Sequence, residues 1–279
     1  MHAVGGKDDE PALGRVRLVC LLVVASQFVP GEPLIVGANR DEVLDRPARP
    51  ITVLDVGPPR VLGGRDELSG GTWLAVNEHG VCAGLTNQPL GDTKDPARRS
   101  RGELPLALAG RENARSAVDA FLGVYRPEDY NGSWLLVGDR TSLFFIDFTG
   151  VTDPAAVALP PGIHVLENRA LGEPSYKVDL VREALGSPVD GDGVVGAFRR
   201  VLADHRIPDG DERPNAANCV HLESFGTRSS CIVRVPDGDA LPRLWVADGP
   251  PCATPYVEAV GLWGRPAAAG PVQSRTSGL

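Results

Sequence analysis

The stretch Val19 to Glu42, V-C-L-L-V-V-A-S-Q-F-V-P-G-E-P-L-I-V-G-A-N-R-D-E, decides how this chain begins to fold. Two apolar runs, 20–28 and 34–38, are separated by the turn-forming residues 30–33 and are followed by a charged tetrapeptide. This pattern predicts a β-hairpin. The hairpin brings Cys20 next to the charged residues at its end. The thiol therefore has either a chemical role or the ordinary role of a buried strand residue.

The length of the chain sets its domain organisation. Its 279 residues are 42% hydrophobic, enough to bury a sizeable core. We expect one domain over residues 20–265, because no linker or internal repeat interrupts the pattern. Residues 1–19 are polar and aperiodic, and predict a disordered extension or a segment that is not translated; residues 266–279 predict a flexible tail.

Charge and cysteine content exclude several classes of function. A formal net charge of −8 leaves no basic surplus for phosphates, so nucleic acid is not an expected partner. No apolar run reaches the ~20 residues of a membrane-spanning helix. Five cysteines without a C-x-x-C pair are typical of a reducing cytoplasm. Residues 15–27 have the outline of a short signal peptide, but the acidic residues 8–10 that precede them oppose export.

The remaining pattern alternates between hairpins and helices, with a loop rich in proline and glycine expected at 46–71. Strands that arrive in hairpins predict mostly antiparallel sheets with helices layered outside them, an α+β fold. The other expected strands are 72–76, 81–87, 133–137, 142–148, 162–166, 231–235 and 241–246, and the expected helices are 103–109, 114–122, 176–185 and 194–205.

Cys20 gains a chemical role if its own α-amino group is free. Val19 precedes it, and in bacteria a GTG codon, which encodes valine within a gene, can start translation; removal of the initiator methionine would then expose Cys20. The α-amine titrates near 7.7–8.0 and the thiol near 8.5, so one residue can supply both base and nucleophile. Arg40 stabilises a thiolate, and Asp41 holds the amine by a hydrogen bond.

Acyl transfer also needs donors for an oxyanion, and two asparagines follow predicted strands. Asn87 and Asn168 are suitable for that work, although each could simply cap a strand or order a turn. Cys219-Val220-His221 offers two metal ligands, but no second pair lies at ligand spacing, so the sequence favours packing there. We therefore expect neither a metal nor a cofactor.

At this point the sequence resembles the NRDE family, also called the Transport and Golgi organisation protein 2 family, which is named after the tetrapeptide Asn39-Arg40-Asp41-Glu42. Any one of its motifs is weak, whereas the ordered set is specific and spans nearly the whole domain. The other motifs are Arg46-Pro47, Gly70-Gly71-Thr72-Trp73-Leu74, Gly84-Leu85-Thr86-Asn87, Arg101-Gly102-Glu103-Leu104, Tyr130-Asn131-Gly132, Leu166-Glu167-Asn168 and Gly226-Thr227-Arg228.

The resemblance implies a four-layer αββα sandwich of the N-terminal-nucleophile hydrolases, similar to the choloylglycine hydrolase and penicillin V acylase group. It implies Cys20 as nucleophile, Arg40 and Asp41 as its activating pair, Asn87 and Asn168 as oxyanion or positioning groups, and Arg228 as a late stabilising charge. The implied activity is hydrolysis of a linear amide in a small acylated substrate. The alternative is a non-catalytic carrier of a hydrophobic ligand such as haem, a lipid or acyl-CoA. Family members begin Met-Cys, whereas 19 residues precede Cys20 here.

Overall fold

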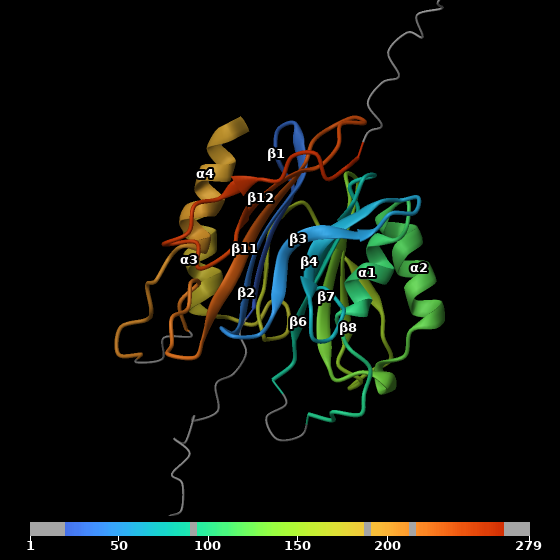
Figure 1. The fold of residues 1–279 in the computed structure, drawn as a ribbon, viewed down its shortest axis with the longest axis horizontal. Coiled ribbons are helices and arrows are strands. Elements are labelled where there is room, and N and C mark those ends of the chain that lie inside the picture. The colour runs from blue at the N-terminus through green and yellow to red at the C-terminus, as the bar shows by residue number, and fades with distance from the viewer. Residues whose placement is uncertain (1–19, 90–93, 187–190, 212–215, 265–279) are drawn as a thin grey trace, which may run out of the picture.

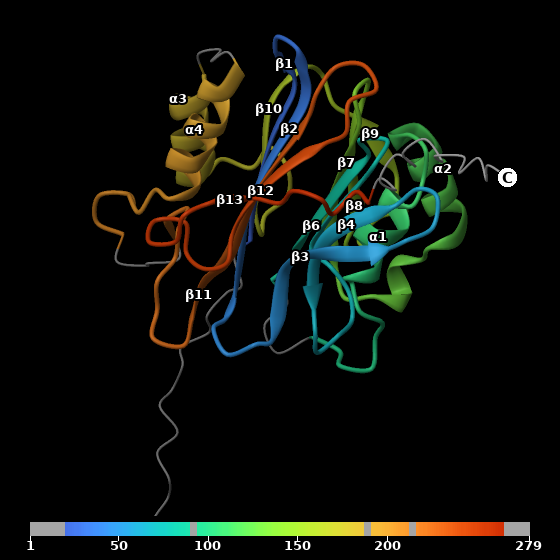
Figure 2. The same cartoon turned by 45° about the horizontal axis from the view of Figure 1, so that its top comes forward.

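The computed structural model describes residues 20–89, 94–186, 191–211 and 216–264. In this part of the chain two antiparallel sheets lie face to face, and each carries a pair of helices on its outer side (Figure 1). Helices α3 (Tyr176–Leu185) and α4 (Gly191–Leu202) cover one sheet, and α1 (Glu103–Ala109) and α2 (Ala114–Val124) cover the other (Figure 2). The four-layer αββα sandwich expected from the resemblance is confirmed.

The first sheet is built around the N-terminal hairpin. Its strands run in the order β10-β1-β2-β11-β12-β13, so β1 and β2 lie beside strands from much later in the chain. Their bounds are β1 Leu21–Val29, β2 Glu32–Val43, β10 Gly162–Leu166, β11 Phe225–Val235, β12 Arg243–Ala247 and β13 Val257–Glu258.

The second sheet follows the order of the sequence, β3-β4-β5-β6-β7-β8-β9, as a continuous meander. Antiparallel neighbours need only short connections, but the segment between β6 and β7 is long and carries two helices. The strands are β3 Ala48–Asp55, β4 Val61–Asp66, β5 Leu74–Asn77, β6 Cys82–Asn87, β7 Ser133–Gly138, β8 Leu143–Phe148 and β9 Ala156–Ala158.

The helices are α1 Glu103–Ala109, α2 Ala114–Val124, α3 Tyr176–Leu185 and α4 Gly191–Leu202, with a short 3-10 turn at Pro127–Asp129. Side-chain caps fix where two of them begin. Asn113 accepts a hydrogen bond from the Ser116 amide at the start of α2, and Ser175 accepts one from the Val178 amide at the start of α3.

Alternation along β1 explains the layers. Leu22 and Val24 point into the core between the sheets, whereas Leu21 and Val23 pack under α3 and α4. A strand buried on both faces reads as a continuous apolar run, as this one does. Gly37 on β2 lets α4 approach closely, because a Cβ there would lie 2.5 Å from the Phe198 ring.

Most expected elements are confirmed, including the first hairpin and the ranges of α1, α3 and β10. Three expectations are wrong. Residues 46–71 form β3 and β4 rather than a loop. The charged tetrapeptide lies inside β2, because β11 pairs with it along its whole length. The last expected helix, 194–205, is α4 and ends at Leu202.

The expected N-terminal extension and C-terminal tail lie outside the described residues. Among the helices that the structure does describe, none is both long enough and apolar enough to span a membrane.

Candidate active site

Cys20 directly precedes β1, where the pairing of Leu21 with Asn39 places it beside the charged part of β2. The backbone nitrogen of Cys20 donates a hydrogen bond to Asn168 Oδ1 at 2.7 Å. Its Sγ lies 3.8 Å from the carbonyl oxygen of Asp41. The first hairpin thus brings the Cys20 thiol to Asp41, whereas Asn168, just after β10, holds the nitrogen in place of the hydrogen bond expected from Asp41.

The surroundings of Cys20 act on its thiol in opposite directions. Burial raises the pKa of Cys20 to about 12, and the Asp41 carboxylate adds to the rise. The hydrogen bond to the Asp41 backbone and the positive charge of Arg40 oppose it. As a residue inside a chain, Cys20 is thus a protonated thiol at neutral pH, and a thiol is a weak nucleophile.

Asp41 is buried in the neighbouring strand and is held from the facing strand. Thr227 on β11 lies opposite it and donates its hydroxyl to Asp41 Oδ1 at 2.6 Å. The Val220 amide donates to Thr227 Oγ1 at 2.9 Å, which fixes the hydroxyl in turn. Burial raises the pKa of Asp41 to about 6, while Lys177 and the Thr227 hydroxyl oppose the rise.

Lys177 on α3 is a site residue that the sequence reasoning missed. It is 2% exposed, and within the described residues its ammonium has no hydrogen-bond partner. Burial lowers its pKa, whereas Asp41, Glu167 and Cys20 favour its charged form. A signal was present in the sequence, since Lys177 shares the apolar face of its helix with Val181 four residues later.

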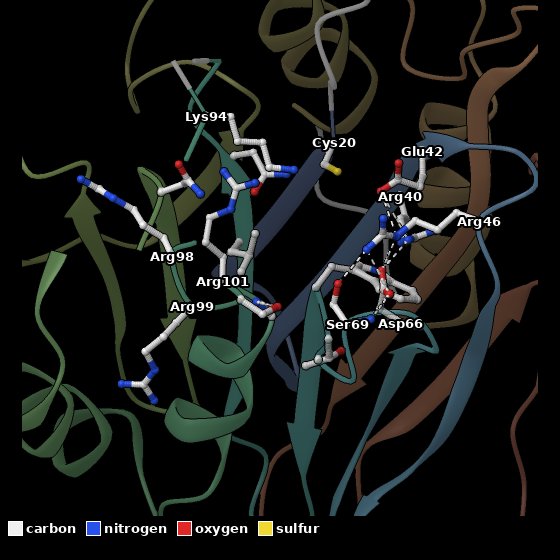
Figure 3. A pocket seen from close by; sticks show the side chains of 18 of the residues that line it. Cys20, Arg40, Glu42, Arg46, Asp66, Ser69, Lys94, Arg98, Arg99 and Arg101 are labelled. Atoms are coloured by element: carbon white, nitrogen blue, oxygen red, sulfur yellow. Dashed lines mark hydrogen bonds and ion pairs between the residues drawn. The ribbon is translucent and has the colours of Figure 1, made fainter. Parts of the chain in front are cut away.

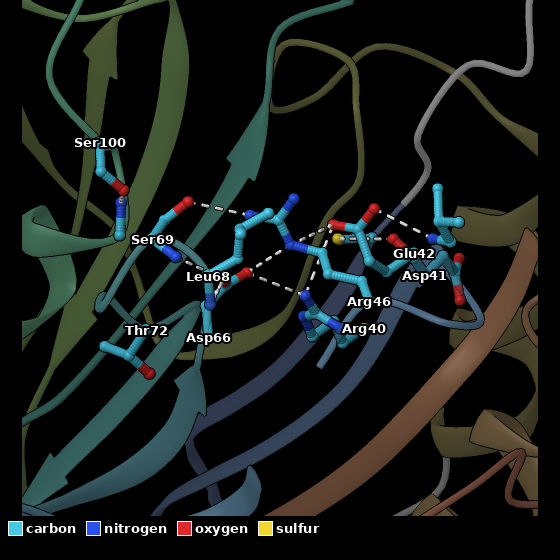
Figure 4. A network of polar contacts seen from close by, with 12 residues as sticks. Arg40, Asp41, Glu42, Arg46, Asp66, Leu68, Ser69, Thr72 and Ser100 are labelled. Carbon is cyan, nitrogen blue, oxygen red and sulfur yellow. Dashed lines mark hydrogen bonds and ion pairs between the residues drawn. The ribbon is translucent and has the colours of Figure 1, made fainter. Parts of the chain in front are cut away.

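Arg40 points to the opposite side of β2 from Asp41, as alternation requires. Its Nη2 lies 3.1 Å from Asp66 Oδ2 and 3.5 Å from Glu42 Oε2 (Figure 4). Its guanidinium carbon lies 4.7 Å from the centre of the Trp73 ring, within cation–π range. A Cβ at Gly64 would collide with that ring, so glycine is required there.

Asp66 is the shared anchor of this network. It also accepts a hydrogen bond of 2.6 Å from Arg46 Nε (Figure 4). Partial burial pushes the pKa of Asp66 upward, but hydrogen bonds from Arg46 and the Ser69 amide outweigh burial and hold it below its usual value. Sequence reasoning missed Asp66 because the expected loop at 46–71 gave it no fixed place.

The two asparagines lie together as expected. Asn168 Nδ2 donates to the backbone oxygen of Asn87 at 2.5 Å, while its Oδ1 holds the Cys20 nitrogen. The Asn87 side chain lines the cavity that contains Cys20, and its Oδ1 is buried without a partner in the described residues. Asn168 thus contacts Cys20 directly, and Asn87 faces the space into which the thiol opens.

That cavity has a volume of about 380 Å³ and is charged on both sides of Cys20 (Figure 3). The Arg40, Arg46 and Asp66 network forms one side. The other carries Arg101, which donates to the Gly132 oxygen at 3.2 Å, and burial lowers its pKa. The same side carries Lys94, Arg98 and Arg99.

A second cavity, of about 660 Å³, begins on the other side of the asparagine pair. Asn168 and Lys177 line it, together with Glu167 and Trp134. Asn168 therefore lines the second cavity and also accepts the hydrogen bond from Cys20, which lines the first.

Arg228 is the one expected site residue that does not line either cavity. Its backbone lies at a register shift of β11, between Thr227 opposite Asp41 and Ser229 opposite Arg40. Its guanidinium turns away and lies 3.1 Å from Asp248.

The family model for Transport and Golgi organisation 2 matches residues 19–240. The chain belongs to the Transport and Golgi organisation 2 family. A cattle protein, Transport and Golgi organization protein 2 homolog, is 32% identical over 234 residues, which is 72% of this chain and 82% of that protein. Its human counterpart is 29% identical over the same shares of the two chains.

Among solved structures, this member of the family resembles a Caenorhabditis elegans protein described as an N-acylethanolamine-hydrolyzing acid amidase ortholog. The TM-score is 0.53, with 13% sequence identity over 76% of this chain and 92% of that one. At this identity the likeness shows a shared fold. The Transport and Golgi organisation 2 domain therefore shares the four-layer fold of that protein, with Cys20 directly before its first strand.

Proposed function

We propose that this protein is an amidohydrolase that cleaves a linear amide C–N bond of a small acylated substrate, with Cys20 as the first residue of the working chain. The observation that carries the proposal is the 2.7 Å hydrogen bond between the Cys20 nitrogen and Asn168 Oδ1, next to the cavity that holds the thiol. The contact fixes the nitrogen of Cys20 where a base for its own thiol would have to stand.

A free amine resolves the chemical difficulty of the buried thiol. An internal amide nitrogen cannot accept a proton, and a thiol whose pKa burial raises to about 12 does not ionise at neutral pH. A neutral α-amine can accept the thiol proton during attack, and the resulting ammonium lies directly beside the new thiolate. Asp41 and Arg40 then stabilise the two charges from opposite faces of β2.

The reaction follows from these positions. The Cys20 sulfur attacks the substrate carbonyl carbon while the α-amine takes the thiol proton, and Asn87 stabilises the oxyanion. The C–N bond then breaks as the ammonium returns that proton to the leaving nitrogen, which leaves a thioester on Cys20. Water attacks the thioester, the amine takes a proton from the water, and rupture of the C–S bond releases the acid and restores the thiol.

The chemistry of the cavity indicates the kind of substrate. Arg101 lies in the cavity wall opposite the Arg40 network, and none of the described carboxylates forms an ion pair with it. We propose that it binds an anionic group on the acylated substrate. Arg228 is proposed only as a support, since its pair with Asp248 steadies the register shift beside Asp41.

A carrier role for haem, a lipid or acyl-CoA is supported less well. The residues that line the Cys20 cavity are mostly charged or polar, and an apolar ligand would have to remove them from water without replacing their hydrogen bonds. Ligand sites for apolar molecules are instead lined mainly by hydrophobic side chains.

The test compares a chain that begins at Cys20 with a chain in which Gly-Ser precedes Cys20. We expect the free-amine chain to hydrolyse N-acyl amides that carry a carboxylate at least about a thousandfold faster. Its Cys20 should also react faster with iodoacetamide at pH 7, which needs no substrate. Thermal unfolding controls for folding. Equal turnover and equal alkylation in the two chains would contradict the proposal.

A further inference from the structure

Four side chains that can bind a metal meet at the end of the first sheet, away from the cavity of Cys20. They are His205, Cys219, His221 and Cys252, and their ligand atoms all lie within 4.8 Å of one another. They come from three separate segments: the chain after α4, the chain before β11, and the turn after β12. Sequence spacing shows only the Cys219-x-His221 pair, and the fold supplies the other two.

We propose that these residues form a structural zinc site with two thiolate and two imidazole ligands. A tetrahedral zinc bound at about 2.3 Å to sulfur and about 2.0 Å to nitrogen places its ligand atoms roughly 3.3–3.8 Å apart. Here His221 Nε2 lies 3.2 Å from Cys252 Sγ and 3.7 Å from Cys219 Sγ. These two separations match the spacing of ligand atoms around a tetrahedral zinc, and the other ligand atoms lie within 4.8 Å of one another.

The second ring nitrogen of His205 supports the assignment. His205 Nδ1 lies 3.0 Å from the carbonyl oxygen of Cys219, and a carbonyl oxygen can only accept, so Nδ1 carries the proton. This tautomer leaves Nε2 with a free lone pair for the metal. A histidine ligand usually donates its other ring N–H to a carbonyl or carboxylate in this way.

The ligand set selects the metal. Two thiolates with two imidazoles in a tetrahedral arrangement favour Zn²⁺ over the harder cations, which prefer oxygen ligands. Cys219 is buried, whereas His205, His221 and Cys252 are exposed, so an ion can reach the site from solvent. Four protein ligands leave no open position, which marks a structural centre rather than a catalytic one.

The zinc site would hold three loops together next to Val220 and Thr227, which support Asp41. The Cys219 amide donates to the Asp204 oxygen at 2.9 Å, and His221 pairs with Gly226 at the start of β11. Between these ligands, the Val220 amide holds the hydroxyl of Thr227 that binds Asp41. Zinc would therefore order the segment that positions Asp41, whether or not the protein is a hydrolase.

The test is the zinc content of the full chain, purified without a metal-affinity step, reduced, and dialysed against metal-free buffer. We expect one equivalent of zinc by mass spectrometry. Cys252→Ser and His205→Ala should each lose most of it and lower the unfolding temperature. Cys231→Ala and His79→Ala remove a thiol and an imidazole elsewhere and should keep it.

Cobalt gives an independent reading of the ligand set. Co²⁺ added to the zinc-free parent should produce thiolate charge-transfer and strong tetrahedral d–d absorption, which Cys252→Ser should weaken. Three results would each overturn the proposal: a parent chain that binds less than about a tenth of an equivalent, unchanged zinc in both ligand variants, or a Cys219–Cys252 disulfide in peptide maps made without reductant.

Discussion

Two buried thiols flank the same strand of the first sheet. Cys231 on β11 lies opposite Ala38 of β2, and Cys20 directly precedes Leu21, which lies opposite Asn39 on the other side of that strand. Both are at least nine-tenths buried, and the pKa of each is raised to about 12. Burial and acidity therefore do not distinguish them.

The residues around the two thiols do distinguish them. Burial alone raises the pKa of Cys231, which packs in the apolar core between the sheets. The pKa of Cys20 results from burial together with the charges of Asp41, Arg40 and Glu42, and Cys20 lines a cavity. A nucleophile is thus recognised by what surrounds the thiol and by access to a hollow, whereas a packing thiol has neither.

The largest expected effect separates the two thiols directly. In the chain that begins at Cys20, Cys20→Ala should reduce kcat/KM by roughly a thousandfold or more, because the bond-forming atom is lost. Cys231→Ala should leave kcat/KM close to the parent and lower the free energy of unfolding by about 1 kcal/mol, since it leaves only a small cavity. Steady-state kinetics and urea unfolding measure both. Equal loss of activity in the two variants would erase the distinction.

The next effect concerns the oxyanion. Asn87→Ala should lower kcat by about 10²–10³-fold with little change in KM, because its amide acts on charge that develops only in the transition state. Asn131→Ala is the matched control, since Asn131 also lines the cavity but its side-chain amide is hydrogen-bonded to the backbone of Asp95. A rise in KM with kcat unchanged for Asn87→Ala would make Asn87 a substrate-binding residue instead.

The pH dependence of stability tests the polar side of Cys20. The pKa of Asp41 rises from 3.8 to about 6 on folding, so the folded state binds its proton more tightly. The contribution of Asp41 to the free energy of unfolding should therefore fall as pH rises from about 4 to 6, by at most about 3 kcal/mol at roughly 1.4 kcal/mol per pKa unit. Asp41→Asn should remove this fall. Parallel stability curves for parent and variant, from denaturant unfolding across that range, would contradict the raised pKa.

The smallest effect concerns the cavity wall. Arg101→Met should raise KM about tenfold for a substrate that carries a carboxylate, and leave KM unchanged for its neutral amide analogue, because only the charged contact is lost. Arg98→Met, on the same side but exposed, should change neither. An equal rise in KM for both substrates with Arg101→Met would mean that Arg101 shapes the cavity without binding charge.

Much of the fold could be predicted because its signals are local. Two apolar runs and the turn residues between them mark the first hairpin, and Asn113 marks the start of α2. The strands β3 and β4 were missed because residues 46–71 are rich in proline and glycine, which usually indicate a loop. An edge strand such as β3 tolerates proline, because its outer side needs no backbone hydrogen bonds. The end of β2 was missed because the strand that pairs with it is β11, where Thr227, opposite Asp41, is 186 residues further along the chain.

The site was predictable where family motifs mark it and hidden where folding alone creates it. The structure brings Cys20, Asn87 and Asn168 together. Asp66, Lys177 and the four groups of the proposed zinc site come together only through tertiary contacts. Spacing in the sequence shows pairs such as Cys219 and His221, but a partner from another segment, such as Cys252, has no local signal.

The most direct test of the account is mass spectrometry of the chain that begins at Cys20, quenched in acid during turnover of an N-acyl amide. We predict a mass increase equal to one acyl group, located on the N-terminal peptide at Cys20 and removed by hydroxylamine as expected for a thioester. Turnover without any adduct on Cys20, or with an adduct on another residue, would contradict the central claim that Cys20 is the nucleophile.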